Sequence, residues 1–364
     1  MKIGILTYHN AHNYGAVLQC YALKETLKSM GHEVNVIDYH NSAIDKYYVN
    51  NRSFNLRNII INLLHGNFSK ISSLRKKDQM QKEIVPLRSG IFEGFQQRFL
   101  DLFPCIENKI PSCFDAYVIG SDMLWDDVCL GGRFDKVYWG DFEKKKSSKV
   151  VGYAISGTPK SFKKCADRFS FDFLKNFTSF SVRENKLKTI IEDTINKPVN
   201  VCLDPTLITE AHLWDGILNK NWANKKYILT YFLSLNKVMR EELTQKTRIL
   251  AQEKGYEVID LDVDTKPINV EDFVSLIKFA QYVITDSFHG TAFSLIFNKS
   301  FHVLRLNKDH DARYADVLER LGMNNLLVSP EFTPEFPIID YESVNKLYSD
   351  MKRASLEYLN ISLS

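Results

Sequence analysis

Short apolar runs alternate with stretches of helical spacing along most of the chain. Residues 2–8 are apolar and rich in β-branched side chains, which predicts a buried strand, and residues 33–39 predict a second one. Between them, residues 16–30 repeat apolar positions at helical spacing and stop at Gly31. A strand, a helix and a strand within about forty residues make a βαβ unit, so we expect a parallel sheet with right-handed crossovers.

The alternation continues to the end of the chain. Further strands are expected at 116–119, 149–154, 177–182, 199–203, 227–233, 257–261, 281–285 and 301–304. Further helices are expected at 160–174, 237–254, 270–279, 290–297, 312–321 and 341–359. Residues 42–104 predict helical pairs, and Pro205 with the polar residues up to Asn224 predicts a linker.

This pattern predicts an α/β protein of two Rossmann-like, doubly wound domains facing a cleft. We expect an N-terminal domain at 1–205, with a helical insertion at about 42–104, and a C-terminal domain at 206–364 that ends in a helix.

Composition changes this picture little. With 364 residues, 45% of them hydrophobic and 25% charged, the chain suits two globular domains and does not suit a disordered or fibrous protein. A net charge of +3 is too small to indicate a nucleic-acid partner. Residues 46–98, however, hold ten Lys or Arg against three Asp or Glu, so we expect a basic face for a membrane surface or an anionic carrier.

The sequence predicts neither export nor a membrane span. The apolar run at 3–7 is far shorter than a secretory signal, and the run at 59–64 is far shorter than the roughly 20 residues that cross a bilayer. The six cysteines form no Cys-x-x-Cys pair and fit reduced core thiols. We therefore expect a cytoplasmic protein that contacts the inner face of the membrane peripherally.

Four polar segments follow predicted strands, where ligands of open α/β sheets bind. In the first, Gly15 permits close backbone approach, and His9, Asn13 and Tyr14 offer polar contacts. An ordinary turn with Asn13 as helix cap explains the same residues. His9 and His12 could ligate a metal, but no third ligand lies at a diagnostic spacing, so we predict no metal site.

The second segment, at 118–125, and the third, at 180–185, offer hydrogen-bonding side chains and one aromatic ring. Ser121 and Asp122 could hydrogen-bond a sugar on which Trp125 stacks, although a capped helix with a core Trp is about equally compatible. Arg183, at a strand end, presents a fork suited to a carboxylate or phosphate. Its alternative role is a simple pair with Glu184.

The fourth segment is the sharpest. His289 precedes the helix expected at 290–297 and lies beside Asp286, Ser287 and Gly290, where it could shuttle a proton or act as a cation beside a phosphate. A structural histidine is the alternative. No Gly-x-Gly-x-x-Gly, Walker loop, His-Glu-x-x-His or Gly-x-Ser-x-Gly occurs at these loops, which argues against the commonest nucleotide, zinc-protease and serine-hydrolase sites.

Five pieces of sequence, in this order, together resemble the polysaccharide pyruvyl transferase family. They are Asn13-Tyr14-Gly15-Ala16-Val17-Leu18-Gln19-Cys20-Tyr21-Ala22-Leu23, Gly120-Ser121-Asp122-Met123-Leu124-Trp125, Ser181-Val182-Arg183-Glu184, Asp204-Pro205-Thr206 and Asp286-Ser287-Phe288-His289-Gly290. The likeness covers most of the chain, although residues 42–82 have no recognisable counterpart. It implies a fold similar to GT-B glycosyltransferases, with the acceptor on the first domain and the donor on the second.

The resemblance also implies an activity: transfer of a pyruvyl group from phosphoenolpyruvate to hydroxyls of a sugar, forming a ketal, in surface or exopolysaccharide synthesis. Phosphoenolpyruvate would be the donor substrate, with no further cofactor. The acceptor would be a sugar carried on polyprenyl pyrophosphate, and no nucleic acid would take part.

Carried over residue by residue, Arg183 would bind the donor and His289 would act at the reacting centre. His289 as general acid would be oriented by Asp286, and Asp122 would receive the hydroxyl proton. Some relatives have an Arg where this chain has Ser287, so a second cation must come from elsewhere. The remaining expected contacts are Ser287, Gly290, Arg305 and Arg313 for the donor, and His9, Asn13, Tyr14, Gly15, Ser121 and Trp125 for the acceptor.

Two other functions compete. A GT-B glycosyltransferase that uses a nucleotide sugar would typically carry a Glu near the helix after the fourth segment, but residues 291–297 contain no acid. A carbohydrate-binding module without activity is more distant, because it would not need Arg183 and His289 in one cleft.

Overall fold

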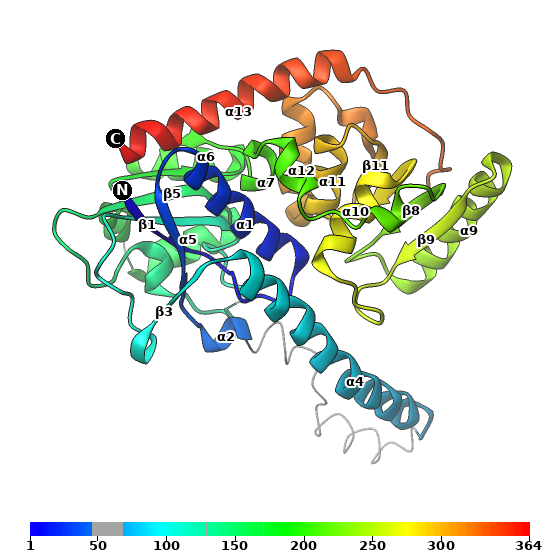
Figure 1. Cartoon of the computed structure of the whole chain (residues 1–364), viewed down its shortest axis with the longest axis horizontal. Helices are drawn as coiled ribbons and strands as arrows, with labels where there is room; N and C mark the ends of the chain where they lie inside the picture. Colours follow the sequence, from blue (N-terminus) through cyan, green and yellow to red (C-terminus); the bar gives the residue numbers. More distant parts are fainter. Residues whose placement is uncertain (46–67, 129, 170, 307) are drawn as a thin grey trace.

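The computed structural model describes residues 1–45, 68–128, 130–169, 171–306 and 308–364 and contains two parallel sheets (Figure 1). The first has the strand order β3 (Leu102–Pro104), β2 (Glu33–Asp38), β1 (Lys2–Leu6), β4 (Ala116–Asp122), β5 (Lys149–Ile155), β6 (Ser179–Val182) and β7 (Asn200–Val201). The second has the order β12 (Leu327–Val328), β11 (Ser300–Leu304), β10 (Tyr282–Thr285), β8 (Tyr227–Tyr231) and β9 (Glu257–Leu261). Two Rossmann-like domains are therefore confirmed.

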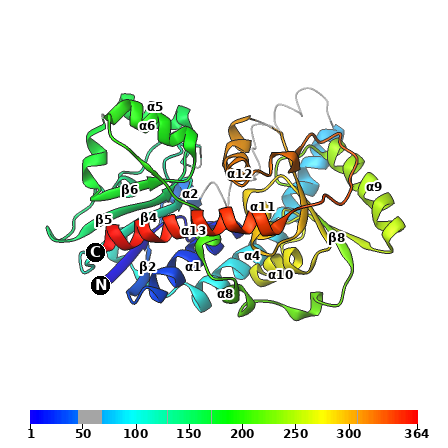
Figure 2. The ribbon, with the colours of Figure 1, turned by 90° about the horizontal axis from the view of Figure 1, so that it is seen from above.

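Strands β1, β2, β4 and β5 of the first sheet carry apolar side chains on both faces, as burial by helices on two sides requires. In β4, Val118 packs into the core that includes α1 (Tyr14–Ser29), while Ile119 packs into a second core. That second core contains side chains of α5 (Pro159–Phe169) and α6 (Asn185–Ile195). Figure 2 shows α5 and α6 together on one side of this sheet.

The second sheet is covered in the same way. Helix α9 (Lys237–Lys254) contributes Leu243 and Ala251 to a core on one face. On the other face, α10 (Val270–Phe279), α11 (Phe288–Ile296) and α12 (Lys308–Arg320) share one continuous core with α1 of the first domain. The two domains are thus joined by a common apolar core.

Polar contacts reinforce this junction. The Tyr14 ring stacks on Phe273 with centroids 4.8 Å apart, and its hydroxyl donates to the Ile268 carbonyl at 2.7 Å. Helix α4 (Phe68–Phe99) adds an ion pair of 2.6 Å between Arg98 and Glu271. These contacts tie α1 and α4 to the second domain.

Three expectations about this architecture need correction. Residues 42–104 are not purely helical, because Leu102–Pro104 pairs with β2 as an edge strand. The expected linker begins with α7 (Pro205–Ile208), whose residues are all buried. The C-terminal helix α13 (Tyr341–Leu363) does not belong to the second domain alone: it runs back across the first (Figures 1 and 2), where the Tyr358 hydroxyl donates to the Gly152 carbonyl at 2.9 Å.

The expected basic face falls largely outside the part that can be described. Between α2 (Ser42–Asp45) and α4, residues 46–67 lie outside the described residues, so this expectation stays a prediction. Among the helices that are described, none combines the length and hydrophobicity needed to cross a bilayer.

Candidate active site

Three of the four polar segments singled out in the sequence lie where the strand order of a sheet reverses, the usual ligand site of open α/β sheets, and the segment of Arg183 follows β6. In the first sheet the reversal separates β1 from β4, and in the second it separates β8 from β10. A cavity of about 670 Å³ opens there, between the two domains. Its walls include Asn13, Gly15, Asp122, Glu184, Ser287 and His289. The predicted cleft is therefore present.

His289 reaches across to the first domain. Ser287 caps α11 by accepting a hydrogen bond from the Gly290 N–H at 3.3 Å, which places His289 in the first turn of the helix. Its imidazole lies against Gly15, so closely that a methyl group at position 15 would lie 1.9 Å from Nδ1. The glycine is thus required for close approach, here to a side chain of the other domain.

Behind the cavity wall lies a buried cluster of charges. Arg183, 1% exposed, donates from Nε to Glu184 at 3.0 Å and from Nη1 to Asp204 at 2.7 Å. Its guanidinium also lies 4.5 Å from the centroid of the Phe288 ring. Glu184 and His289 reach the cavity wall, whereas Arg183 stands behind them. Arg183 therefore does not reach a donor bound in the cavity, contrary to expectation. It positions the carboxylates of Glu184 and Asp204 instead.

Three polar atoms of this cluster are buried without a hydrogen-bond partner among the described residues. They are Arg183 Nη2, Glu184 Oε2 and His289 Nε2. The nearest carboxylate oxygen to His289 Nε2 is Asp204 Oδ1, at 3.9 Å. Buried polar atoms are rarely left unpaired outside functional sites, so this cluster is the strongest candidate for chemistry.

Burial sets the protonation of the cluster. It lowers the pKa of His289, although the Asp204 and Asp122 carboxylates oppose the shift. It raises the pKa of Glu184 despite the neighbouring Arg183. Burial would also raise the pKa of Asp204, but the charges of His289 and Arg183 outweigh it and hold that pKa below its usual value. Negative charge placed beside His289 would favour its protonated form.

Asp286 does not orient His289, contrary to expectation. Its carboxylate accepts hydrogen bonds from three successive backbone N–H groups, those of Leu233, Ser234 and Leu235, at 2.6, 2.8 and 3.0 Å. The reason is that β8 and β10 pair in the sheet, so the loops after them meet. Asp286 thereby fills an anion-binding turn with a carboxylate of the chain itself.

Gly290 is likewise a packing residue, not a donor contact. A methyl group at this position would lie 2.5 Å from Oγ1 of Thr285, so glycine is needed for α11 to lie close to β10.

Most residues expected to bind the acceptor lie in the core. Trp125 is 0% exposed and stacks on Trp139 with centroids 4.5 Å apart, so it cannot stack on a sugar. Ser121 is buried and donates to the Ala154 carbonyl at 2.7 Å. Tyr14 packs between the domains. His9 is buried and hydrogen-bonded to Asp38 at 2.9 Å. These four expectations are wrong.

The remaining acceptor candidates, Asn13 and Gly15, do line the cavity with Asp122. Asn13 also caps α1, accepting from the Ala16 N–H at 3.2 Å. The Asp122 Oδ1 atom accepts from the Met123 N–H at 2.9 Å, and Asp122 lies near enough to His289 to influence its charge.

The cavity has cations as well. Arg313, on α12, lines it, whereas Arg305 is exposed and stands away from it. Lys160 and Lys186 also line it, and neither they nor Arg313 pair with a carboxylate of any described residue. These lysines and the carboxylates Glu184 and Asp204 were not predicted as site residues, although both acids follow predicted strands.

One family of known proteins matches most of the chain. The model of the polysaccharide pyruvyl transferase family matches residues 13–308. No curated protein is significantly similar in sequence.

Solved structures similar over nearly the whole chain include an epimerase and a glycosyltransferase. For the UDP-GlcNAc 2-epimerase from Methanocaldococcus jannaschii, identity is 14%, coverage 97% of this chain and 93% of that chain, and the TM-score 0.48. For the glycosyltransferase SnogD from Streptomyces nogalater, the figures are 12%, 100%, 99% and 0.44. At these values the likeness carries no argument about function.

Proposed function

We propose that this chain, which belongs to the polysaccharide pyruvyl transferase family, transfers a pyruvyl group from phosphoenolpyruvate to hydroxyls of a sugar. The observation that carries the proposal is His289: it lines a cavity between two domains and has an unpartnered ring nitrogen beside a buried Arg–Glu–Asp cluster.

The cations of the cavity suit this donor. Phosphoenolpyruvate carries a carboxylate and a phosphate, and Arg313, Lys160 and Lys186 are the unpaired cations on the described wall. Arg313 supplies the fork that matches either group. The anion-binding turn after β8 is already filled by Asp286, which leaves it closed to the diphosphate of a nucleotide sugar. We propose that no further cofactor serves the transfer.

The reaction divides between two side chains, an acid and a base. Protonated His289 gives its proton to the methylene carbon of phosphoenolpyruvate, which becomes a methyl group and leaves a cationic carbon. A sugar hydroxyl attacks that carbon as Asp122 accepts its proton. A second hydroxyl of the same sugar attacks as the C–O bond to phosphate breaks, and its proton leaves with the phosphate. The products are a pyruvyl ketal and inorganic phosphate.

Binding of the donor would also change the protonation state of His289. Burial lowers the pKa of His289, so the free site favours neutral imidazole. The phosphate and carboxylate of the bound donor would favour the imidazolium and so charge the acid only when it is needed. Asp204, 3.9 Å away, adds to this effect.

The acceptor and the place of action remain part of the proposal. We propose a sugar carried on polyprenyl pyrophosphate in surface or exopolysaccharide synthesis, met by a cytoplasmic enzyme at the inner face of the membrane. The support is the local excess of Lys and Arg at 46–98. Such attraction should weaken as salt screens it.

A release assay tests the donor. The chain is incubated with phosphoenolpyruvate and a panel of lipid-linked or aryl glycosides, and inorganic phosphate is measured. We expect acceptor-dependent release that falls by roughly 10²–10⁴-fold in His289→Ala. The matched control is His212→Ala, an exposed histidine of α8 (Ala211–Asp215), which should match the wild type. Hexose transfer from a nucleotide sugar without phosphate release would overturn the proposal.

A further inference from the structure

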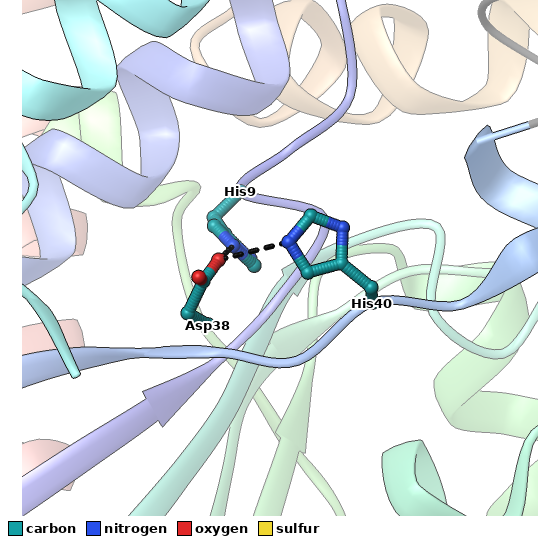
Figure 3. Close-up of side chains that lie close together, drawn as sticks. All are labelled: His9, Asp38 and His40. Atoms are coloured by element: carbon teal, nitrogen blue, oxygen red, sulfur yellow. Dashed lines mark hydrogen bonds and ion pairs between the residues drawn. The ribbon is translucent and has the colours of Figure 1, made fainter. Parts of the chain in front are cut away.

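Outside the cavity, three potential metal ligands meet at the carboxyl ends of β1 and β2. His9 Nε2 lies 2.9 Å from Asp38 Oδ1, and His40 Nε2 lies 3.1 Å from the same oxygen (Figure 3). All three ligand atoms lie within 4.8 Å of one another. In the described part of the chain, no other three His, Cys, Asp or Glu side chains are grouped in this way.

We propose that His9, Asp38 and His40 bind a divalent transition-metal ion of the zinc class. Zinc bonds of about 2.0–2.1 Å in a tetrahedral site put neighbouring ligand atoms about 3.3 Å apart, within a few tenths of an ångström of both distances to Asp38. His9 is buried and held in place, whereas His40 is 52% exposed on its side chain and free to close the remaining gap. Three protein ligands leave a fourth position for water.

The hydrogen bonds around His9 favour this role. Its Nε2 lies 2.9 Å from the Asp38 carboxylate, so without a metal ion the ring donates its proton there. Its Nδ1 lies 3.4 Å from the Thr7 carbonyl, an acceptor that can take the ring proton when a metal ion occupies Nε2. A carbonyl that fixes the tautomer of a ligating histidine is the usual second contact of such sites.

His40 must change tautomer to bind. Its Nδ1 lies 3.0 Å from the Asn10 amide nitrogen, which can only donate, so the proton of a neutral His40 sits on Nε2 and points at Asp38. A metal ion on Nε2 requires this proton on Nδ1 instead, where the Asn10 amide can accept it once its oxygen turns towards the ring.

The ion would hold a wall of the cavity. His9 opens the segment that leads to Asn13 and Gly15, and its carbonyl accepts from Gln96 Nε2 at 3.0 Å. Asp38 ends β2, and His40 follows it. A metal shared by these three residues clamps the loop after β1 to the loop after β2. The inference is independent of the donor proposed above.

Zinc uptake by the full-length chain tests this site. Chelator-treated protein is titrated with Zn²⁺ alone, and cobalt absorption spectra report the coordination. We expect one Zn²⁺ per chain, a tetrahedral cobalt spectrum and a melting temperature that rises with zinc. His40→Ala should bind at least about tenfold more weakly. His212→Ala, which removes an exposed histidine elsewhere, should match the wild type.

Two outcomes would overturn the proposal. One is a wild-type chain that takes up no zinc, in which case the three residues form a hydrogen-bonded triad only. The other is equal zinc binding by His40→Ala. Because His40 is half exposed, this variant should keep its fold, which its melting curve without zinc checks. Asp38→Asn, which keeps the shape of the side chain and removes its charge, gives a second test and should also lose zinc.

Discussion

Gly15→Ala tests whether the packing of His289 against the first domain sets its reactive position. The added methyl group would lie 1.9 Å from His289 Nδ1, whereas ordinary contact begins at 3.4 Å, so the ring must move by about 1.5 Å. Misplacement of a reacting group by about 1 Å can cost 10²-fold. We therefore expect turnover to fall by at least roughly 10²-fold.

The stability of this variant should change much less. Alanine favours a helix over glycine by roughly 0.5–1 kcal/mol, and overpacking costs about 1–3 kcal/mol. The net loss is small beside a stability of about 5–15 kcal/mol, so the variant should stay folded. Gly90→Ala, on α4 with no atom within 4 Å of the added methyl, is the matched control and should keep full turnover.

The assay is steady-state phosphate release from phosphoenolpyruvate, together with thermal melting of each variant. A double-mutant cycle assigns the effect: in a His289→Ala background, Gly15→Ala should cost little further activity, because the clashing ring is gone. Wild-type turnover in Gly15→Ala, or the same loss in both backgrounds, would show that contact with Gly15 does not set the position of His289.

Three further predictions concern other parts of the site. Burial lowers the pKa of His289 in the free enzyme, and the charge of the bound donor raises it. With rising pH, kcat/KM, which reports the free enzyme, should therefore fall at a lower pH than kcat, which reports the complex. Coincident profiles, or flat profiles from about pH 5 to 9, would contradict the acid role. Arg313→Ala should raise the KM for phosphoenolpyruvate by roughly 10–100-fold, from the loss of a charged hydrogen bond, whereas the exposed Arg305→Ala should not; equal KM values in both variants would count against Arg313. Asp286→Ala leaves three N–H groups without their acceptor and should lower the free energy of urea unfolding by about 2–4 kcal/mol; an unchanged value would mean that these bonds are replaced by water.

Much of the fold could be predicted because local signals agree with the packing. The bounds expected for α9, β9 and α10 match those observed. Asn236 caps the start of α9 through its side chain, and Gly255 ends it in a left-handed conformation. Helix α6 was not predicted, because it buries only Leu187 and Ile191 and so carries a narrow apolar stripe.

The site was harder to predict, because strand-end position does not say where a side chain points. Trp125 follows a strand as a sugar-stacking residue would, yet the stacking of Trp139 draws it into the core. Which side chains become hydrogen-bond or ion-pair partners also depends on the order of strands in the sheet. The pairing of β8 with β10 brings Asp286 to the backbone of Leu233, and Asp204 instead lies 3.9 Å from His289.

The metal ligands were missed for the same reason. The spacing of His9 and His12 shows no third ligand, but β1 and β2 are neighbours in the sheet, so the loops that follow them meet. This brings Asp38 and His40 to His9, while His12 stacks on Phe92 instead.

The mass of the acceptor after reaction in heavy water tests most directly whether His289 protonates phosphoenolpyruvate. The chain is given phosphoenolpyruvate and a nucleotide sugar together, with an aryl glycoside as acceptor, and the product is analysed by mass spectrometry. Proton transfer to the methylene carbon predicts an acceptor that gains one pyruvyl ketal whose methyl group carries one solvent deuterium, with no such product from His289→Ala. An acceptor that gains a hexose, or a ketal formed at full rate by His289→Ala, would contradict the account.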